Sequence, residues 1–265
     1  MEFQKKQIVE GIILIISCQK HEKTRLKEFR LKNNEYSGWK VIYVLGDFFL
    51  ECKYKLNENL MTVKCEDSYI HLFKKLVLSI KYIYEIYEIK QGVLRCGDDL
   101  VFNEDNLTKF LEIPIKLDLM GCSPVKHSIF NPKLSQLKEV KEDYFMCDYY
   151  LNHQEDVLNP QHNLKNVDIS KYIKRPKIDI GVGGNMYYIS NKSCNCLVQH
   201  MENINYDIFH FDEFTQSYPY TIEDCAASFI LYLNGIGFYN IIDFVEDQNF
   251  DNFYYNVAVS TNKYR

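Results

Sequence analysis

The sequence lacks the features that would place it in several common classes of protein. None of its apolar runs approaches the roughly 20 residues that a membrane-spanning helix requires, and the run at 12–16 lacks the layout of a signal peptide. It has no internal repeat and no Gly/Ser-rich linker. These absences predict one domain over residues 1–265, without a membrane span, and favour a cytoplasmic location.

The sequence also lacks a basic excess. It has 31 Lys and Arg residues against 36 Asp and Glu residues, which gives a net charge of −5. Proteins that bind nucleic acid usually carry a strong basic excess, so the composition argues against a nucleic-acid partner. Apolar residues make up 46% of the chain and charged residues 25%, which are values of a globular protein and exclude disorder as the dominant state.

The nine cysteines are odd in number and form no C-x-x-C pair. Structural zinc sites normally combine two paired sets of ligands, so the single pair of Cys194 and Cys196 is a poor metal signal. Several cysteines lie inside apolar runs, as small core side chains do. We therefore expect free thiols and a reducing compartment.

The first hundred residues alternate between strand and helix signals. Residues 69–87 carry an apolar stripe at i, i+3, i+4 and i+7 spacing, and Ser68 is a candidate N-cap. Alternation of this kind favours βαβ units and a mostly parallel sheet. The predicted strands are 11–17, 41–45, 60–63 and 92–96, and the predicted helices are 21–32, 69–87 and 105–111.

The second half has weaker signals. Residues 127–175 are polar and aperiodic, which predicts a long functional or mobile loop. We expect two halves, at about 1–112 and about 113–265, in a single Rossmann-like α/β domain whose mixed, mostly parallel central sheet is flanked by helices. The predicted strands are 117–120, 186–189 and 238–244, and the predicted helices are 190–201 and 221–233.

Asp98 and Asp99 directly follow the predicted strand at 92–96. Ligands of open α/β sheets bind at this end of the strands. A divalent cation that neutralises a phosphate group prefers carboxylate oxygens, so the pair is a candidate metal site. The alternative is a solvated acidic turn that caps the next helix.

The segment 67–111 resembles the β-1,3-galactosyltransferase and Fringe family of glycosyltransferases. Asp67-Ser68-Tyr69, Leu72 and Lys75 match a helix block of that family, and residues 95–102 (RCGDDLVF) stand where the family has its acidic, DxD-like metal turn. Further matching blocks follow the family order and are the strand at 13–17 with Arg25 and Arg30, Val44-Leu45-Gly46, residues 184–190, Glu223-Asp224-Cys225 and residues 233–236.

The resemblance implies the glycosyltransferase-A fold and a metal-dependent, inverting hexosyltransferase. Such an enzyme moves a sugar from a UDP-sugar to a hydroxyl of a glycan or glycosylated acceptor, here through a β-1,3 linkage, with Mn²⁺ or Mg²⁺. Asp99 would hold the metal, Asp224 would be the catalytic base, and Glu223 would be its alternate or would orient the acceptor. The implied donor-binding residues are Ser17, Arg25, Arg30, Lys75, Asp98 and Gly184, with Lys75 supporting the acids of the metal turn. The half at about 1–112 would then bind the nucleotide sugar, and the half at about 113–265 would bind the acceptor.

Each of these residues also has an ordinary structural interpretation. Arg25, Arg30 and Lys75 can be exposed helix residues, the Glu223-Asp224 pair can be an acidic helix start favoured by the dipole, and Gly184 can be a turn glycine.

The sequence departs from the family at several positions. Gly97 replaces the first acid of the metal turn, Met186 and Ser228 replace glycines, and no histidine follows His210. The chain also lacks the family's anchor and disulfides, which favours a cytosolic viral, bacterial or protist enzyme. Two alternatives remain open. One is a non-catalytic carbohydrate- or nucleotide-binding protein, and the other is a nucleotidyltransferase, which the absence of a Gly-rich phosphate loop disfavours.

Overall fold

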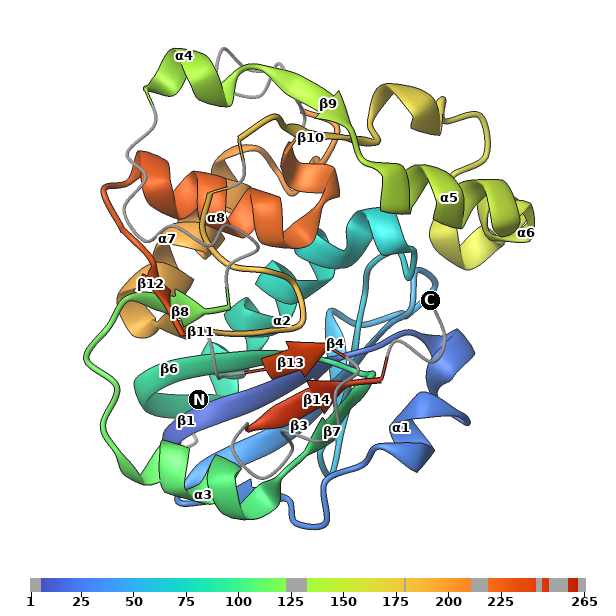
Figure 1. Cartoon of the computed structure of the whole chain (residues 1–265). Helices are drawn as coiled ribbons and strands as arrows, with labels where there is room; N and C mark the ends of the chain where they lie inside the picture. Colours follow the sequence, from blue (N-terminus) through green and yellow to red (C-terminus); the bar gives the residue numbers. More distant parts are fainter. Residues whose placement is uncertain are drawn as a thin grey trace.

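The computed structural model describes residues 6–122, 133–178, 180–210, 219–241, 245–247 and 257–261. Within these ranges the central sheet has nine strands, in the order β12-β8-β11-β6-β1-β3-β5-β4, and β2 pairs with β3. The expected mixed, mostly parallel sheet flanked by helices is confirmed (Figure 1). The strands are β1 (Gln7–Ile16), β2 (Glu35–Tyr36), β3 (Trp39–Gly46), β4 (Tyr54–Asn57), β5 (Leu60–Val63), β6 (Tyr87–Gly97), β8 (Leu119–Gly121), β11 (Met186–Ser190) and β12 (Tyr239–Asn240).

The parallel part of the sheet is formed by β6, β1, β3 and β5, while β11 runs antiparallel between β6 and β8. Strand β1 is buried on both faces because its apolar run is continuous rather than alternating. Ile12 and Leu14 face one core, and Ile13 and Ile15 face the other. The pattern that predicted a fully buried strand at 11–17 therefore places β1 at the centre of the sheet.

Helices cover both faces of the sheet (Figure 1). On one face α2 packs against α7 and α8, and their apolar residues share the core with Ile12 and Leu14. The other face is covered by α1 and α3. These helices are α1 (Arg25–Glu28), α2 (Leu72–Ile86), α3 (Glu104–Glu112), α7 (Asn191–Asn203) and α8 (Glu223–Leu233).

The predicted helix at 69–87 corresponds to a 3-10 turn, η2 (Tyr69–His71), followed by α2. Ser68 is the N-cap residue of η2, but its hydroxyl makes no cap hydrogen bond and instead lies 2.6 Å from His71 Nδ1. The predicted helix at 190–201 corresponds to α7. Ser190 is its N-cap residue, and the Ser190 side chain accepts a hydrogen bond from Ser193 N.

The predicted helix at 21–32 is wrong for most of its length. The segment begins with the 3-10 turn η1 (Gln19–His21) and contains only the short α1. Leu26 and Leu31 are its buried apolar side chains, so it has no continuous apolar stripe that could stabilise a longer helix by packing. The interruption matters for the site, because it directs His21 and Arg25 towards the end of β6.

The long aperiodic loop expected at 127–175 contains several short helices and strands in the part that the structure describes. Helix α5 carries apolar residues around its whole circumference, which hides its periodicity, and Asp143 caps it by accepting from Met146 N. The elements there are α4 (Leu134–Leu137), β9 (Val140–Glu142), α5 (Tyr144–Asn152), α6 (Gln154–Leu158), η3 (Pro160–His162), η4 (Ile169–Lys171) and β10 (Lys174–Pro176).

A second, small sheet lies beside the end of β6. It consists of β7 (Leu100–Phe102), β14 (Ala258–Ser260) and β13 (Val245–Asp247), with β14 antiparallel to β7. The turn η5 (Pro219–Thr221) precedes α8. The predicted strand at 238–244 is represented by β12, and its residues 242–244 lie outside the described residues.

Candidate active site

Four parallel strands end at one edge of the central sheet, and polar side chains collect at this edge. Ser17 follows β1, Gly46 is the last residue of β3, and Asp67 lies shortly after β5. Asp98 follows β6. Because ligands of open α/β sheets bind outside the carboxyl ends of the strands, this edge is the candidate site.

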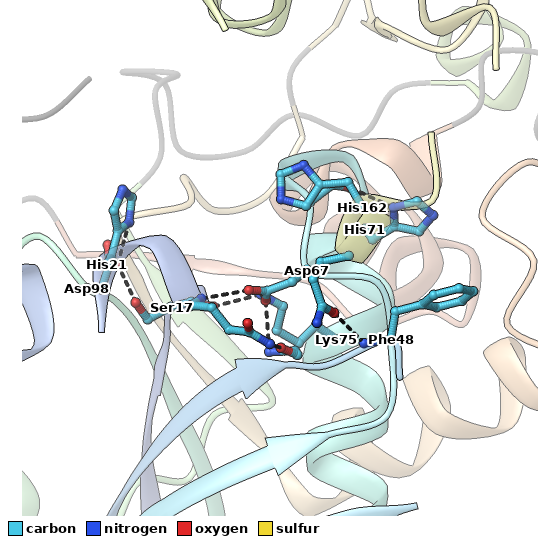
Figure 2. Close-up of polar contacts among 12 residues, drawn as sticks. Ser17, His21, Phe48, Asp67, His71, Lys75, Asp98 and His162 are labelled. Atoms are coloured by element: carbon cyan, nitrogen blue, oxygen red, sulfur yellow. Dashed lines mark hydrogen bonds and ion pairs between the residues drawn. The ribbon is translucent and has the colours of Figure 1, made fainter. Parts of the chain in front are cut away.

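The carboxylate of Asp98 is held by three donors from the segment after β1, and two of them, Ser17 and His21, are labelled in Figure 2. Ser17 Oγ donates to Oδ2 over 2.6 Å, and His21 Nδ1 lies 3.0 Å from the same oxygen. Arg25 Nη1 donates to Oδ1 over 3.0 Å. The structure thus brings together Ser17, Arg25 and Asp98, and it adds His21, which the sequence analysis did not single out.

The side chains of Asp98 and His21 are both charged at neutral pH. Burial would raise the pKa of the Asp98 carboxyl, but hydrogen bonds from His21 and Ser17 and the charge of Arg25 lower this pKa to about 2. Burial would lower the pKa of His21, but the hydrogen bond to Asp98 and the neighbouring Cys18 raise it to about 9. At neutral pH two cations therefore surround one carboxylate, which favours an anionic ligand at this point.

Asp99 lies on the other side of the turn and contacts the C-terminal strand β14. Ser260 Oγ donates to Asp99 Oδ2 over 3.4 Å, and Thr261 N donates to the Asp99 carbonyl over 3.0 Å. The side chain is largely buried, since Asp99 is 8% exposed. No histidine follows His210, but a residue near the end of the chain, Ser260, nevertheless reaches the turn.

Gly97 provides the space that the Asp99 carboxylate occupies. A Cβ atom at Gly97 would lie only 2.9 Å from Asp99 Oδ1, closer than real Cβ contacts. An acidic residue at position 97, like any residue with a side chain, would therefore displace the Asp99 carboxylate.

Lys75 binds Asp67 and not the acids of the turn (Figure 2). Its Nζ donates to Asp67 Oδ1 over 2.5 Å and to the Ser17 carbonyl over 2.7 Å, and the residue is 1% exposed. Asp67 also accepts from Gly46 N over 2.8 Å. The expectation that Lys75 supports the acids of the metal turn is therefore corrected. Its enclosed ammonium group binds the Ser17 carbonyl, and it is the Ser17 hydroxyl that binds Asp98.

Arg30 is separated from Arg25 and lines a cavity of about 460 Å³ between α1 and the sheet. Its guanidinium lies 5.3 Å from the centre of the Tyr43 ring, and Nη2 donates to Asn59 Oδ1 over 2.8 Å. The two arginines of the sequence pattern thus have different surroundings. The cavity is lined by Glu22, Lys23, Leu26, Lys27, Arg30, Tyr43 and Leu60.

Glu223, the first residue of α8, is enclosed and bound through both carboxylate oxygens. Arg95 Nη2 lies 3.0 Å from Oε2, and the Tyr187 hydroxyl donates to Oε1. Burial raises the pKa of Glu223 to about 7, against the opposing charge of Arg95 and with a contribution from Asp224. This carboxylate is therefore part of a buried network that joins α8 to β6.

Asp224 is half-buried and has a different environment. Cys225 N donates to its Oδ1 over 2.8 Å, while its Oδ2 makes no hydrogen bond within the described residues. A Cβ atom at Gly184 would lie 3.3 Å from that Oδ2, so the glycine leaves this oxygen accessible. Burial raises the pKa of Asp224 above its ordinary value.

Residues 184–185 connect the acidic turn to Asp224. Gly97 N donates to the Asn185 carbonyl over 2.8 Å, and Arg95 donates to the Gly184 carbonyl. The turn therefore contacts Asn185, while Gly184 lies near Asp224, because a Cβ atom at Gly184 would be 3.3 Å from Asp224 Oδ2.

A divalent cation at this edge would find few ligands from the protein. The described residues contain no group of three or more His, Cys, Asp or Glu side chains that could hold a metal ion. Asp98 is bound by three donors, so Asp99 is the carboxylate of the turn that remains for a cation. A cation that is also bound by phosphate oxygens of a ligand fits this arrangement, as Mg²⁺ sites commonly combine one or two carboxylates with substrate phosphates.

Sequence reasoning missed three residues of this edge. Arg95 interrupts the apolar run that predicts a buried strand at 92–96. Because a buried charge requires a partner, this arginine could have been recognised from the sequence as part of a buried ion pair. His21 and Ser260 carry no comparable signal, because their partners Asp98 and Asp99 are distant in the sequence.

Comparison with known proteins adds little to this picture. No protein-family model matches the sequence, and no curated protein shows significant similarity to it. Among solved structures, the glycosyltransferase GlyE of Streptococcus pneumoniae TIGR4 matches with a TM-score of 0.41 and 12% sequence identity, over 90% of this chain and 46% of that chain. The chain thus spans about half the length of GlyE, and a similarity at this level carries no inference about activity.

In the part of the chain that the structure describes, no helix is both long enough and apolar enough to cross a bilayer.

Proposed function

We propose that the chain is an inverting glycosyltransferase that moves a hexosyl group from a UDP-sugar to a hydroxyl of a glycan or glycosylated acceptor. The observation that carries the proposal is the edge where β1 and β6 end. There, an acidic turn flanked by His21 and Arg25 contacts segment 184–185, whose Gly184 lies near a carboxylate oxygen of Asp224 that makes no hydrogen bond within the described residues. The resemblance of residues 67–111 to the β-1,3-galactosyltransferase and Fringe family supports the same reaction class.

The donor diphosphate is assigned to the turn at 97–99. His21 and Arg25 supply positive charge there, and both are bound by Asp98, which also accepts a hydrogen bond from Ser17. A divalent cation, Mn²⁺ or Mg²⁺, would be held by Asp99 together with the donor phosphates, where it would offset the charge of the leaving diphosphate. Gly184 and Arg30 complete the donor side, with the nucleoside directed towards the cavity beside Tyr43.

Asp224 is assigned as the catalytic base. The acceptor hydroxyl oxygen attacks the anomeric carbon, its proton passes to Asp224 Oδ2, and the bond from the anomeric carbon to the diphosphate oxygen breaks with inversion. A raised pKa suits this role, because it makes the carboxylate a stronger base. Glu223 is a positioning residue in this account, since both of its oxygens are bound by Arg95 and Tyr187.

The acceptor side is assigned to residues 113–265, with a β-1,3 linkage as the product. A cytoplasmic location also belongs to the proposal.

The direct test is release of UDP from a panel of UDP-sugars with manganese, in the presence of simple glycosides as acceptors. Asp224→Asn should lower release by at least about 100-fold, the scale of a general base, and should keep the thermal shift caused by UDP. Asp105→Asn, an exposed acid on α3, is the matched control and should change neither quantity. Full activity of Asp224→Asn would show that Asp224 is not the catalytic base.

A second candidate is a binding protein without turnover. The engagement of Asp98 by three donors and the glycine at position 97 favour it, because both reduce the carboxylates that are available for a metal. This candidate predicts a UDP-dependent thermal shift in the wild-type protein with no UDP release from any UDP-sugar.

A further inference from the structure

The side chain of Asp67 joins three segments at the edge where the parallel strands end. Its Oδ2 accepts from Gln19 N over 2.7 Å, and its Oδ1 accepts from Gly46 N over 2.8 Å. Lys75 Nζ donates to the same Oδ1, and both side chains are labelled in Figure 2. Asp67 is 4% exposed. One buried carboxylate thus holds together the turn after β1, the end of β3 and helix α2.

The turn that Asp67 holds is the one that carries His21. Gln19 is the first residue of η1 and His21 is the last, and the His21 ring binds Asp98. The Gln19 side chain adds a second bond to the end of β3, because its Nε2 donates to the Gly46 carbonyl over 2.7 Å. Only one residue separates Gln19 from His21, so a displacement of Gln19 would also move the imidazole relative to Asp98.

Gly46 allows the carboxylate to lie this close to the end of β3. A Cβ atom at Gly46 would lie 2.6 Å from Asp67 Oδ1, a distance that real Cβ atoms essentially never show. The close approach of Asp67 to the backbone therefore requires a glycine at this position.

Gln161, which is distant in the sequence, binds the backbone of Asp67. Its carbonyl accepts from Asp67 N over 3.0 Å. Its side-chain amide accepts from Phe48 N over 2.9 Å and donates to Asp47 Oδ1 over 3.2 Å. Gln161 lies on η3, where the side chain of the N-cap residue Asn159 accepts from Gln161 N. A short, capped turn of the second half is thus bound to the segments that follow β3 and β5.

We propose that Asp67 is a positioning residue of the donor site, which holds the turn at 17–21 so that His21 and Arg25 reach Asp98, and that Gln161 fixes Asp67 in this place. The inference rests on the proposed function, because that function assigns a donor diphosphate to the two cations. It makes the donor site depend on a residue of the half at about 113–265. Asp67 acts through the turn and does not contact the donor.

The first readout is the protonation of the His21 ring, which requires no donor. Burial would lower the pKa of His21, but its bond to Asp98 and the neighbouring Cys18 raise it to about 9. The wild-type ring should therefore be protonated at pH 8, as long-range proton–nitrogen NMR measures on the ring nitrogens. A ring that has left Asp98 returns towards its ordinary pKa of 6.5 and is mostly neutral at pH 8.

The main variant is Gln161→Ala, because it leaves the buried pair of Asp67 and Lys75 intact. Its His21 ring should be mostly neutral at pH 8. Gln154→Ala is the matched control, since Gln154 is exposed on the neighbouring helix α6, and its ring should be protonated as in wild type. The single variant Asp67→Asn would leave Lys75 buried without a counter-charge, so the double variant Asp67→Asn/Lys75→Met removes both charges and should also give a neutral ring.

The second readout is the Kd for UDP with manganese, obtained from the thermal shift. Gln161→Ala should raise this Kd by about tenfold, the factor that loss of one charge-assisted hydrogen bond to the diphosphate gives. Gln154→Ala should leave it unchanged. The melting temperature without ligand checks that each variant is folded. A role of Gln161 in stability alone would lower the melting temperature and leave the His21 ring and the Kd as in wild type.

A His21 ring that stays protonated at pH 8 in both Gln161→Ala and the double variant would overturn the proposal. A wild-type ring that is neutral at pH 8 would overturn it as well, and so would a wild-type Kd in folded Gln161→Ala. Absence of UDP binding by wild type would reject the proposed function instead. The His21 ring would then still decide whether Asp67 and Gln161 position the turn.

Discussion

Arg95 on β6 and Glu223 on α8 form an ion pair in the interior of the protein, with Arg95 Nη2 3.0 Å from Glu223 Oε2. Both side chains are almost fully buried. The pair fixes the start of α8, and therefore the position of Asp224, against the strand that ends in the acidic turn. It links the proposed base to the proposed donor site through the core.

This ion pair predicts an asymmetric response to mutation. Arg95→Met should lower the free energy of unfolding by about 3 kcal/mol, because it leaves a buried carboxylate without its counter-charge. The double variant Arg95→Met/Glu223→Leu should recover much of that loss. Urea denaturation measures both. The exposed pair of Lys192 and Asp118 is the control, and Lys192→Ala should cost less than about 1 kcal/mol. Equal costs for Arg95→Met and Lys192→Ala would contradict the interpretation.

Gly97 gives a prediction that runs against the family pattern. Gly97→Asp restores the acid of the related sequences, yet its Cβ would lie 2.9 Å from Asp99 Oδ1 and would push that carboxylate away. We expect a folded protein, because the displaced atom ends a short side chain, with UDP release lower than in wild type. Gly97→Ala should show the same loss. Increased activity of Gly97→Asp would contradict this, because it would show that an acid at position 97 helps the reaction more than displacement of Asp99 harms it.

His21 predicts a pH dependence of stability. Its pKa of about 9 lies above the ordinary value of 6.5, so the protonated imidazole stabilises the folded state. This contribution is fully present below pH 6.5 and is lost as the pH rises through 9, with a size on the order of 2 kcal/mol. His21→Gln should flatten this part of the stability curve in urea denaturation at pH 6 to 10. Because Cys18 faces the same ring, the comparison is repeated in Cys18→Ala, where the slope should persist.

The sequence predicted the elements whose signals are local. The buried strand β1 and the apolar stripe of α2 follow from hydrophobic patterns within a short window, and the edge at Asp98 follows from the position of the turn after a strand. The mixed, mostly parallel sheet is therefore predictable from these patterns.

The sequence could not predict relationships that depend on distant contacts. Arg25 and Arg30 look equivalent in the pattern, but the interruption of the expected helix sends one to Asp98 and the other to the cavity beside Tyr43. Lys75 is charged and sits on a helix, which suggests exposure, yet Asp67 allows it to be buried. The contact of Ser260 with Asp99 depends on a C-terminal strand whose partner is far away in the chain.

A donor screen by thermal shift tests the central claim most directly. Uridine, guanosine and adenosine diphosphates are compared, with and without manganese, in wild type and in Asp99→Asn. The account predicts selective stabilisation by UDP that grows with manganese in wild type and loses its manganese dependence in Asp99→Asn. No stabilisation of wild type by any uridine nucleotide would contradict it.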